Sequence, residues 1–186
     1  MPAHARGSQG DGVITLDDLR AICRHTKVTQ LDLFVEPLNA AMREFEIDAN
    51  VARETHFLAQ IAHESEGFIY VREIASGAEY EGRRDLGNIE PGDGERFRGR
   101  GLIQITGRDN YARCGAALGL DLLTDPGLLE SPLLASRSAG WYWHEHGCNA
   151  LADLGDARAI TKKINGGLNG YQDRLAYLEL AQQRLA

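Results

Sequence analysis

Two glutamates nine positions apart, Glu64 and Glu73, are the side chains whose type and spacing best fit a catalytic pair. Apolar residues recur at helical spacing over residues 56–65, so Glu64 should occupy the last turn of a helix. Gly67 can supply a left-handed stop, and the apolar run 68–71 predicts an extended segment leading to Glu73. The two carboxylates would then face each other across a cleft. Glycoside hydrolysis uses such a pair, one as the acid for the leaving oxygen and one for water or the sugar carbon.

Glutamates are also common as solvated side chains of helices, so the spacing alone does not decide between the two interpretations. The motifs around the pair carry more information. AHESEGF, at residues 62–68, is followed by YEGRRDLGN at 80–88, FRGRGLIQITGRDNY at 97–111 and ITKKINGGLNGYQDR at 160–174. In this order they resemble the family 19 glycoside hydrolases, the plant-type chitinases and the phage endolysins of the same fold. The resemblance runs from about residue 50 to residue 178.

The resemblance implies a mainly α-helical, α+β lysozyme-like domain with two lobes, a small β element and a central substrate cleft. It also implies inverting hydrolysis of β-1,4 bonds between N-acetylated amino sugars, with Glu64 as the general acid and Glu73 as the general base. No cofactor and no metal are expected. Two departures from the family pattern are Glu66, where many members have a small residue, and Leu102, where many have proline.

The segment 99–106 alternates in polarity, which predicts a short strand with Gln104 and Thr106 on one face. From the residues alone these two could simply complete a sheet edge. The resemblance matches Thr106 to a hydroxyl that orients the attacking water, and Arg174 to an arginine that supports the carboxylates. It matches the sugar-contacting positions to Gln104, Asn110 and Asn165.

Residues 77–100 are rich in glycine and charge and have little apolar periodicity, so they predict a long loop. In the family this region lines the cleft, which makes Tyr80 and Asn88 candidates for sugar contact. An exposed tyrosine in a glycine-rich loop needs no ligand, however, so this alternative stays open.

The remaining segments predict scaffold helices. Thr15 and Thr29 each precede an apolar-periodic run with an aspartate three residues on, as N-caps do. Trp141 and Trp143 are expected in the core rather than stacked on sugars. Further helices are predicted over residues 109–118, 132–146, 156–164 and 171–185.

A chain of 186 residues with 43% hydrophobic content predicts one globular domain, over residues 13–186, after a disordered leader at 1–12. The net charge of −7 argues against general nucleic-acid binding. A local arginine excess over residues 96–113 could meet acidic groups of a wall polymer or merely balance the glutamates.

The three cysteines, Cys23, Cys114 and Cys148, have no metal-like spacing and are expected to be reduced thiols. The sequence has no apolar run of membrane-spanning length and no signal-like N-terminus, so we expect no membrane insertion. These features favour a monomeric endolysin that acts on peptidoglycan over a chitinase that acts on chitin. It would be made in the cytoplasm of the producing cell and reach the wall by a signal-independent route.

Two alternatives come from other classes of protein. His56, His63 and Glu64 could belong to a zinc peptidase, but the motif requires a second histidine at the position of Gly67. A non-catalytic glycan-binding module is the other alternative. Cys114 as a nucleophile ranks lower still, because no histidine lies near it in the sequence.

Overall fold

The computed structural model describes residues 14–186, so the predicted leader lies outside the described residues. The α-helices are α1 (Leu16–Ile22), α2 (Val28–Glu44), α3 (Val51–Glu64), α4 (Asp93–Arg96), α5 (Arg108–Leu118), α6 (Pro132–Glu145), α7 (Cys148–Asp153), α8 (Ala157–Asn165) and α9 (Tyr171–Leu185). Short 3₁₀ turns are η1 (Ile47–Ala49), η2 (Ala78–Tyr80), η3 (Arg84–Leu86) and η4 (Pro126–Glu130). None of the helices in residues 14–186 has the length and apolar character needed to cross a membrane.

Helix ends follow local capping chemistry where the sequence carries a clear signal. Thr15 caps α1 through a reciprocal pair with Asp18, as predicted. The predicted cap at Thr29 is wrong: Lys27 is the capping residue of α2, and Thr29 lies inside the first turn. The sequence pattern missed this start because Lys27 caps with its backbone alone and forms no side-chain bond.

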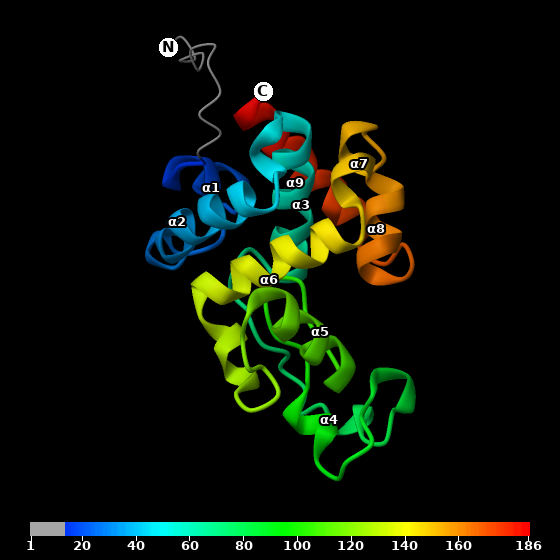
Figure 1. Ribbon diagram of the computed structural model, residues 1–186. Coiled ribbons are helices and arrows are strands. Elements are labelled where there is room, and N and C mark those ends of the chain that lie inside the picture. The colour runs from blue at the N-terminus through cyan, green and yellow to red at the C-terminus, as the bar shows by residue number, and fades with distance from the viewer. Residues whose placement is uncertain (1–13) are drawn as a thin grey trace.

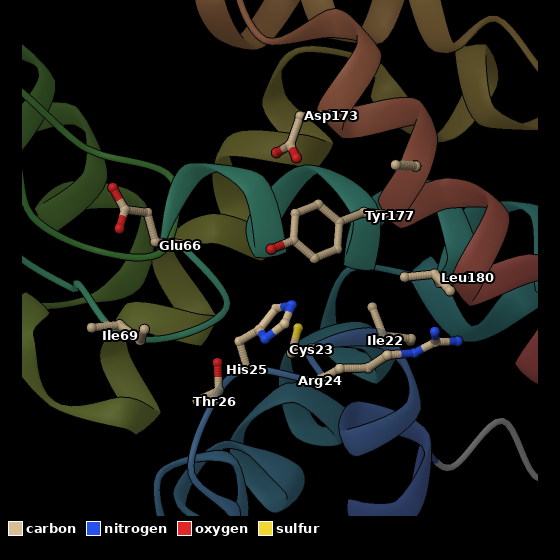
Figure 2. A pocket seen from close by; sticks show the side chains of 11 residues that line it. Ile22, Cys23, Arg24, His25, Thr26, Glu66, Ile69, Asp173, Tyr177 and Leu180 are labelled. Carbon is tan, nitrogen blue, oxygen red and sulfur yellow. The ribbon is translucent and has the colours of Figure 1, made fainter.

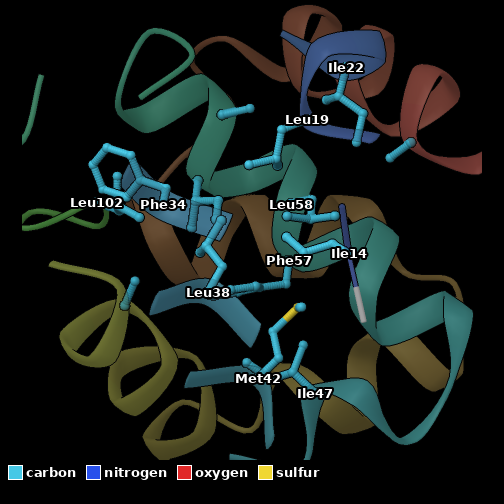
Figure 3. Packing of buried hydrophobic residues seen from close by; sticks show 14 of the residues in the cluster. Ile14, Leu19, Ile22, Phe34, Leu38, Met42, Ile47, Phe57, Leu58 and Leu102 are labelled. Atoms are coloured by element: carbon cyan, nitrogen blue, oxygen red, sulfur yellow. The ribbon is translucent and has the colours of Figure 1, made fainter. Parts of the chain in front are cut away.

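The helices form two lobes that share α6 (Figure 1). In the upper lobe, α3 packs against α9, α1 against α2 and α9, and α2 against α6. In the lower lobe, α5 packs against α6. Trp143 of α6 belongs to the upper core, where its ring meets the edge of Phe57, while Trp141 belongs to the lower core. Figure 3 shows the upper core, in which buried side chains of α1, α2 and α3 interdigitate.

The predicted strand over residues 99–106 is wrong. Within the described residues, β structure is limited to isolated bridges of Arg100 with Arg72 and with Ile105. The apolar alternation has another cause: Leu102 and Ile103 point into the upper core, whereas Ile105 points into the lower core. This segment therefore crosses between two cores, and a left-handed turn at Gly101 lets it do so.

The glycine-rich segment 77–100 carries η2, η3 and α4 rather than being irregular throughout. Asp93, which is buried, pins it to α5. Its carboxylate accepts hydrogen bonds from the backbone N–H groups of Ile89 and Glu90 and from the Arg108 guanidinium. The arginine, followed by the two backbone N–H groups, lowers the pKa of Asp93 below its ordinary 3.8 despite burial.

This contact predicts a pH-dependent stability. Because the folded-state pKa of Asp93 is lowered, its contribution is present above about pH 4 and is lost as the pH falls through the folded value. Asp93→Asn should lower the free energy of unfolding at pH 7 by about 3 kcal/mol, measured by urea titration with circular dichroism. When the pH is lowered from about 5 to about 2, the free energy of unfolding of the mutant should fall less than that of the wild type.

The matched control is Asp85→Asn, since Asp85 pairs with Arg83 at the surface. An exposed ion pair contributes little to stability, because water and salt screen it. Equal, small effects of the two substitutions would contradict the assigned role of Asp93.

Candidate active site

Glu64 is the last residue of α3, as predicted, and α9 holds its carboxylate in place. The Arg174 guanidinium pairs with Glu64 Oε1 through Nη2 and donates through Nη1 to Gln60 Oε1 at 2.5 Å. Arg174 is only 2% exposed, so its charge is compensated by Glu64, while Gln60 accepts a hydrogen bond from one of its N–H groups. Gln60, one helical turn before Glu64, was missed by the sequence analysis, although the four-residue spacing could have revealed it.

A second pair lies beside the first. His63 Nδ1 and Asp173 Oδ2 are 2.6 Å apart, again joining α3 to α9. Gly170, the N-cap of α9, packs directly on the imidazole: a Cβ there would lie 2.3 Å from a ring carbon. Two consecutive residues of each helix are thus tied together, which fixes the direction in which Glu64 leaves α3.

The segment after Glu64 is a left-handed turn, and the extended run predicted for residues 68–71 is wrong. Glu66, Gly67 and Phe68 all have positive φ, at 49°, 71° and 70°. Such angles are costly for residues other than glycine and persist only where the surroundings impose them. The Ser65 hydroxyl accepts a hydrogen bond from the backbone N–H of Phe68, and the Phe68 ring is buried against Phe34.

Two side chains, one from the loop between α1 and α2 and one from α2, brace this turn. Thr26 donates from its hydroxyl to the Gly67 carbonyl at 2.7 Å, and Gln30 donates from Nε2 to the Phe68 carbonyl at 2.8 Å. The turn joins Glu64 to the segment that carries Glu73. Its shape therefore sets how the two carboxylates are placed relative to each other.

Replacing Thr26 tests this bracing. Thr26→Val removes the hydrogen bond to Gly67 at nearly constant volume, so kcat should fall roughly tenfold while KM changes little, because small displacements act on the transition state. Thr26→Ser keeps the hydroxyl and should retain activity. If valine lowers thermal stability but leaves kcat intact, the brace supports the fold only.

The Glu73 carboxylate is held by a different part of the chain. Tyr80 donates its hydroxyl to Oε1 at 3.0 Å, and the backbone N–H of Gly99 donates to Oε2 at 3.1 Å. The backbone N–H of Glu73 in turn donates to the Gly99 carbonyl. Burial and the neighbouring Glu73 raise the pKa of Tyr80 to about 12, so Tyr80 remains a hydrogen-bond donor at neutral pH. The structure thus joins Tyr80 to the predicted general base.

A cavity of about 160 Å³ lies near Gly99, and three predicted residues, Gln104, Thr106 and Asn110, line it. Gln104 packs against Gly99, where a Cβ would lie 2.4 Å from its Oε1, so the cavity adjoins the backbone that holds Glu73. Asn110 donates from Nδ2 to the backbone carbonyl of Thr106, so this hydrogen bond does not involve the Thr106 hydroxyl. The sequence analysis missed the opposite side of the cavity, which is formed by Arg113, Trp141, Tyr142 and His146.

Tyr142 connects this cavity with the other carboxylate. Its ring stacks on His146 at 3.8 Å, and its hydroxyl donates to the Lys163 carbonyl near the end of α8. Burial, then Cys148 and Glu64, raise the pKa of Tyr142 to about 12. Tyr142 lines the cavity, and its pKa responds to the charge of Glu64 as well as to burial.

The remaining predicted residues are placed differently. Asn88 is fully buried, and its amide serves two backbone groups, donating to the Tyr80 carbonyl and accepting from the Arg108 N–H. Asn88 thereby ties the Tyr80 turn to the start of α5, and its sugar contact stays a prediction. Asn165 is the exposed last residue of α8, next to the left-handed cap Gly166. Its sugar contact stays a prediction.

The arginine excess is largely used inside the lower lobe. Arg100 pairs with Glu130, Arg108 with Asp93 and Arg113 with Glu145. Arg96 donates to the carbonyls of residues 123 and 124. Most of these charges therefore hold the lobe together, and Arg113 also reaches the cavity.

The alternative chemistries find little support in this geometry. Residues 14–186 contain no cluster of three or more His, Cys, Asp or Glu side chains suited to a metal ion. His56 is buried, and burial lowers its pKa. Cys114 is buried and free, and burial raises the pKa of its thiol to about 12, so it would not form a nucleophilic thiolate.

Comparison with known families decides the membership. The family model described as "Chitinase class I" matches residues 38–152. A glycosyl hydrolase family 19 domain-containing protein of Haemophilus influenzae is 36% identical over 157 residues, covering 67% of this chain and 76% of that protein. The chain belongs to glycoside hydrolase family 19. An endochitinase of Arabidopsis thaliana is 43% identical over 111 residues, which cover 59% of this chain and 38% of the endochitinase.

Solved structures of family 19 enzymes confirm the predicted fold class. Chitinase C from Streptomyces griseus superposes with a TM-score of 0.76 at 23% identity, covering 97% of this chain and 79% of that one. A bacterial family 19 chitinase superposes with a TM-score of 0.75, covering 93% and 95%. The lysozyme-like, mainly helical architecture is therefore shared. The predicted β element is reduced here to isolated bridges.

Proposed function

We propose that this family 19 protein hydrolyses β-1,4 bonds between N-acetylated amino sugars with inversion of the anomeric carbon. One observation carries the proposal. The two carboxylates are anchored independently, Glu64 by the buried Arg174 and Glu73 by Tyr80 and the Gly99 backbone. Separate anchoring suits a pair that must remain apart with a sugar and a water between them.

In this mechanism Glu64 gives its proton to the leaving oxygen, while Glu73 takes a proton from the attacking water. The Tyr80 hydroxyl and the Gly99 N–H keep the Glu73 carboxylate oriented for that transfer. Thr106, on the cavity beside Gly99, positions the water. Gln104 and Asn110 supply polar groups to the sugar at the same cavity.

We further propose peptidoglycan as the substrate. All three cysteines are buried and free, which suits a protein that folds in a reducing cytoplasm before release to the wall. Arg113 brings a guanidinium to the cavity that holds Thr106, where the lactyl carboxylate of a muramic acid that carries no peptide could pair with it. Chitin carries no such carboxylate.

Chitin is the second candidate, because relatives from Arabidopsis thaliana and Streptomyces griseus are named as chitinases. Digesting purified peptidoglycan and chitin oligosaccharides in parallel separates the two. Mass spectrometry of the products should show new muramic acid reducing ends from peptidoglycan. In rate measurements, kcat/KM should be lower for chitin oligosaccharides than for peptidoglycan fragments. Efficient cleavage of chitin alone would overturn the peptidoglycan proposal, and cleavage of neither would overturn the glycosidase proposal.

Glu64→Gln tests the general acid. The amide keeps the size of the side chain but carries no transferable proton, so turnover should fall by at least about a hundredfold. Circular dichroism should show an unchanged fold. Near-normal hydrolysis by the folded variant would show that the proton comes from another group.

Thr106→Val tests the orientation of the water. Removing the hydroxyl should lower kcat while leaving oligosaccharide affinity nearly unchanged, because only transition-state geometry is lost. Thr106→Ser should behave like the wild type. If valine weakens binding and spares turnover of bound substrate, Thr106 contacts the sugar instead.

A further inference from the structure

A second, larger cavity lies on the N-terminal side of the left-handed turn, outside the machinery described above. Its volume is about 300 Å³, and three parts of the chain line it: residues 22–26, the turn residues Glu66 and Ile69, and α9 from Asp173 to Leu180. Figure 2 shows the rings of His25 and Tyr177 on facing sides of the space. Neither the family resemblance nor the proposed chemistry uses this cavity.

The charges of the cavity are segregated. Arg24 and His25 line it from the loop after α1, whereas Glu66 and Asp173 line it from the turn and from α9. Burial, and then Cys23, Asp173 and Glu66, raise the pKa of Tyr177, so both carboxylates act on its ring hydroxyl. A basic side and an acidic side therefore share one small space.

Apolar side chains complete the lining. Ile22 and Leu180 contribute from α1 and α9, and Ile69, 48% exposed, contributes from the turn. A second hollow of about 320 Å³ is also lined by Ile69 and by His25, and it adds Lys27 and Gln30. The two hollows thus share His25, Thr26 and Ile69, and together they are called the groove below.

The cavity adjoins the Glu64 site through the chain itself. Glu66 follows Glu64 by two residues, and Asp173 precedes Arg174, the partner of Glu64. Asp173 also binds His63, so it belongs to both the cavity and the α3–α9 pairing. A group attached to a glycan near Glu64 would have this groove as an adjacent place to bind.

We propose that this groove, lined by Arg24, His25, Glu66, Asp173 and Tyr177, binds the peptide stem of peptidoglycan. The inference rests on the proposed peptidoglycan function and names what distinguishes that substrate from chitin. The N-terminus of this peptide is amide-bonded to the lactyl group of muramic acid, so the peptide offers the side-chain amine of its diamino acid, carboxylates and apolar side chains. The amine pairs with Glu66 and Asp173, a carboxylate with Arg24 and His25, and an apolar side chain packs on Ile22 and Leu180. Chitin offers none of these charged groups.

Binding of the free stem peptide tests the proposal without any hydrolysis. The probe is the stem tripeptide acetylated at its N-terminus, because that nitrogen is acylated in the wall. Titrating this probe into labelled protein should shift the NMR signals of His25 and Tyr177. The same probe with its side-chain amine also acetylated and its carboxylates amidated should bind at least about tenfold more weakly, because both kinds of ion pair are lost. Arg24→Ala and Glu66→Gln should each weaken binding of the charged probe by a similar factor.

Arg158→Ala is the matched control for Arg24→Ala, since Arg158 is exposed on α8 and does not line the cavity. It should bind the peptide like the wild type. In kinetic assays Arg24→Ala should raise KM for peptidoglycan and leave turnover of chitin oligosaccharides unchanged.

The proposal is overturned if the free peptide shifts no cavity signals, or if the charged and blocked peptides bind equally well. It is also overturned if Arg24→Ala and Arg158→Ala behave alike. These outcomes can occur while peptidoglycan is still cleaved. Failure of the groove is thereby distinguishable from failure of the proposed glycosidase.

Discussion

The buried guanidinium of Arg174 is the contact on which the arrangement of the site depends. A charge at 2% exposure is stable only with partners at hand, and Glu64 and Gln60 of α3 provide them. Because Arg174 belongs to α9, forming this contact requires the last helix to dock on the third. The position of Glu64 is therefore coupled to the correct packing of the whole upper lobe.

The Glu73 carboxylate is held by a separate set of contacts. Its contacts come from Tyr80 and the Gly99 backbone, and the segment between them is held by Asp93 and Asn88 against the start of α5. Helix α6 contributes to both cores, through Trp141 and Trp143, and so does the segment 102–105. The two carboxylates are thus held by different sets of contacts.

Local chemistry made the helices predictable. The capping box at Thr15, the left-handed Gly119 at the end of α5 and the bounds of α9 follow from a few neighbouring residues. The same reasoning failed for residues 68–71 and 99–106. There the conformation is imposed by tertiary contacts: Thr26 and Gln30 brace the first segment, and the second passes between two cores.

The site shows the same limit. Spacing and resemblance indicated Glu64, Glu73 and Arg174, but the residues that hold them, such as Gln60 and the Gly99 backbone, depend on how distant segments meet. Asn88 illustrates the converse. A polar residue in a glycine-rich loop suggested a sugar contact, whereas its buried amide donates to one backbone group and accepts from another.

The central claim is that Glu64 and Glu73 act from opposite walls on a sugar with a water between them. The most direct measurement is proton NMR of the anomer released in the first moments of hydrolysis of a short β-1,4-linked oligosaccharide. Attack by water from the face opposite the leaving group predicts that the α-anomer appears first, before mutarotation. An initial β-anomer would mean retention of configuration. Glu73 could then not be the base that activates the water.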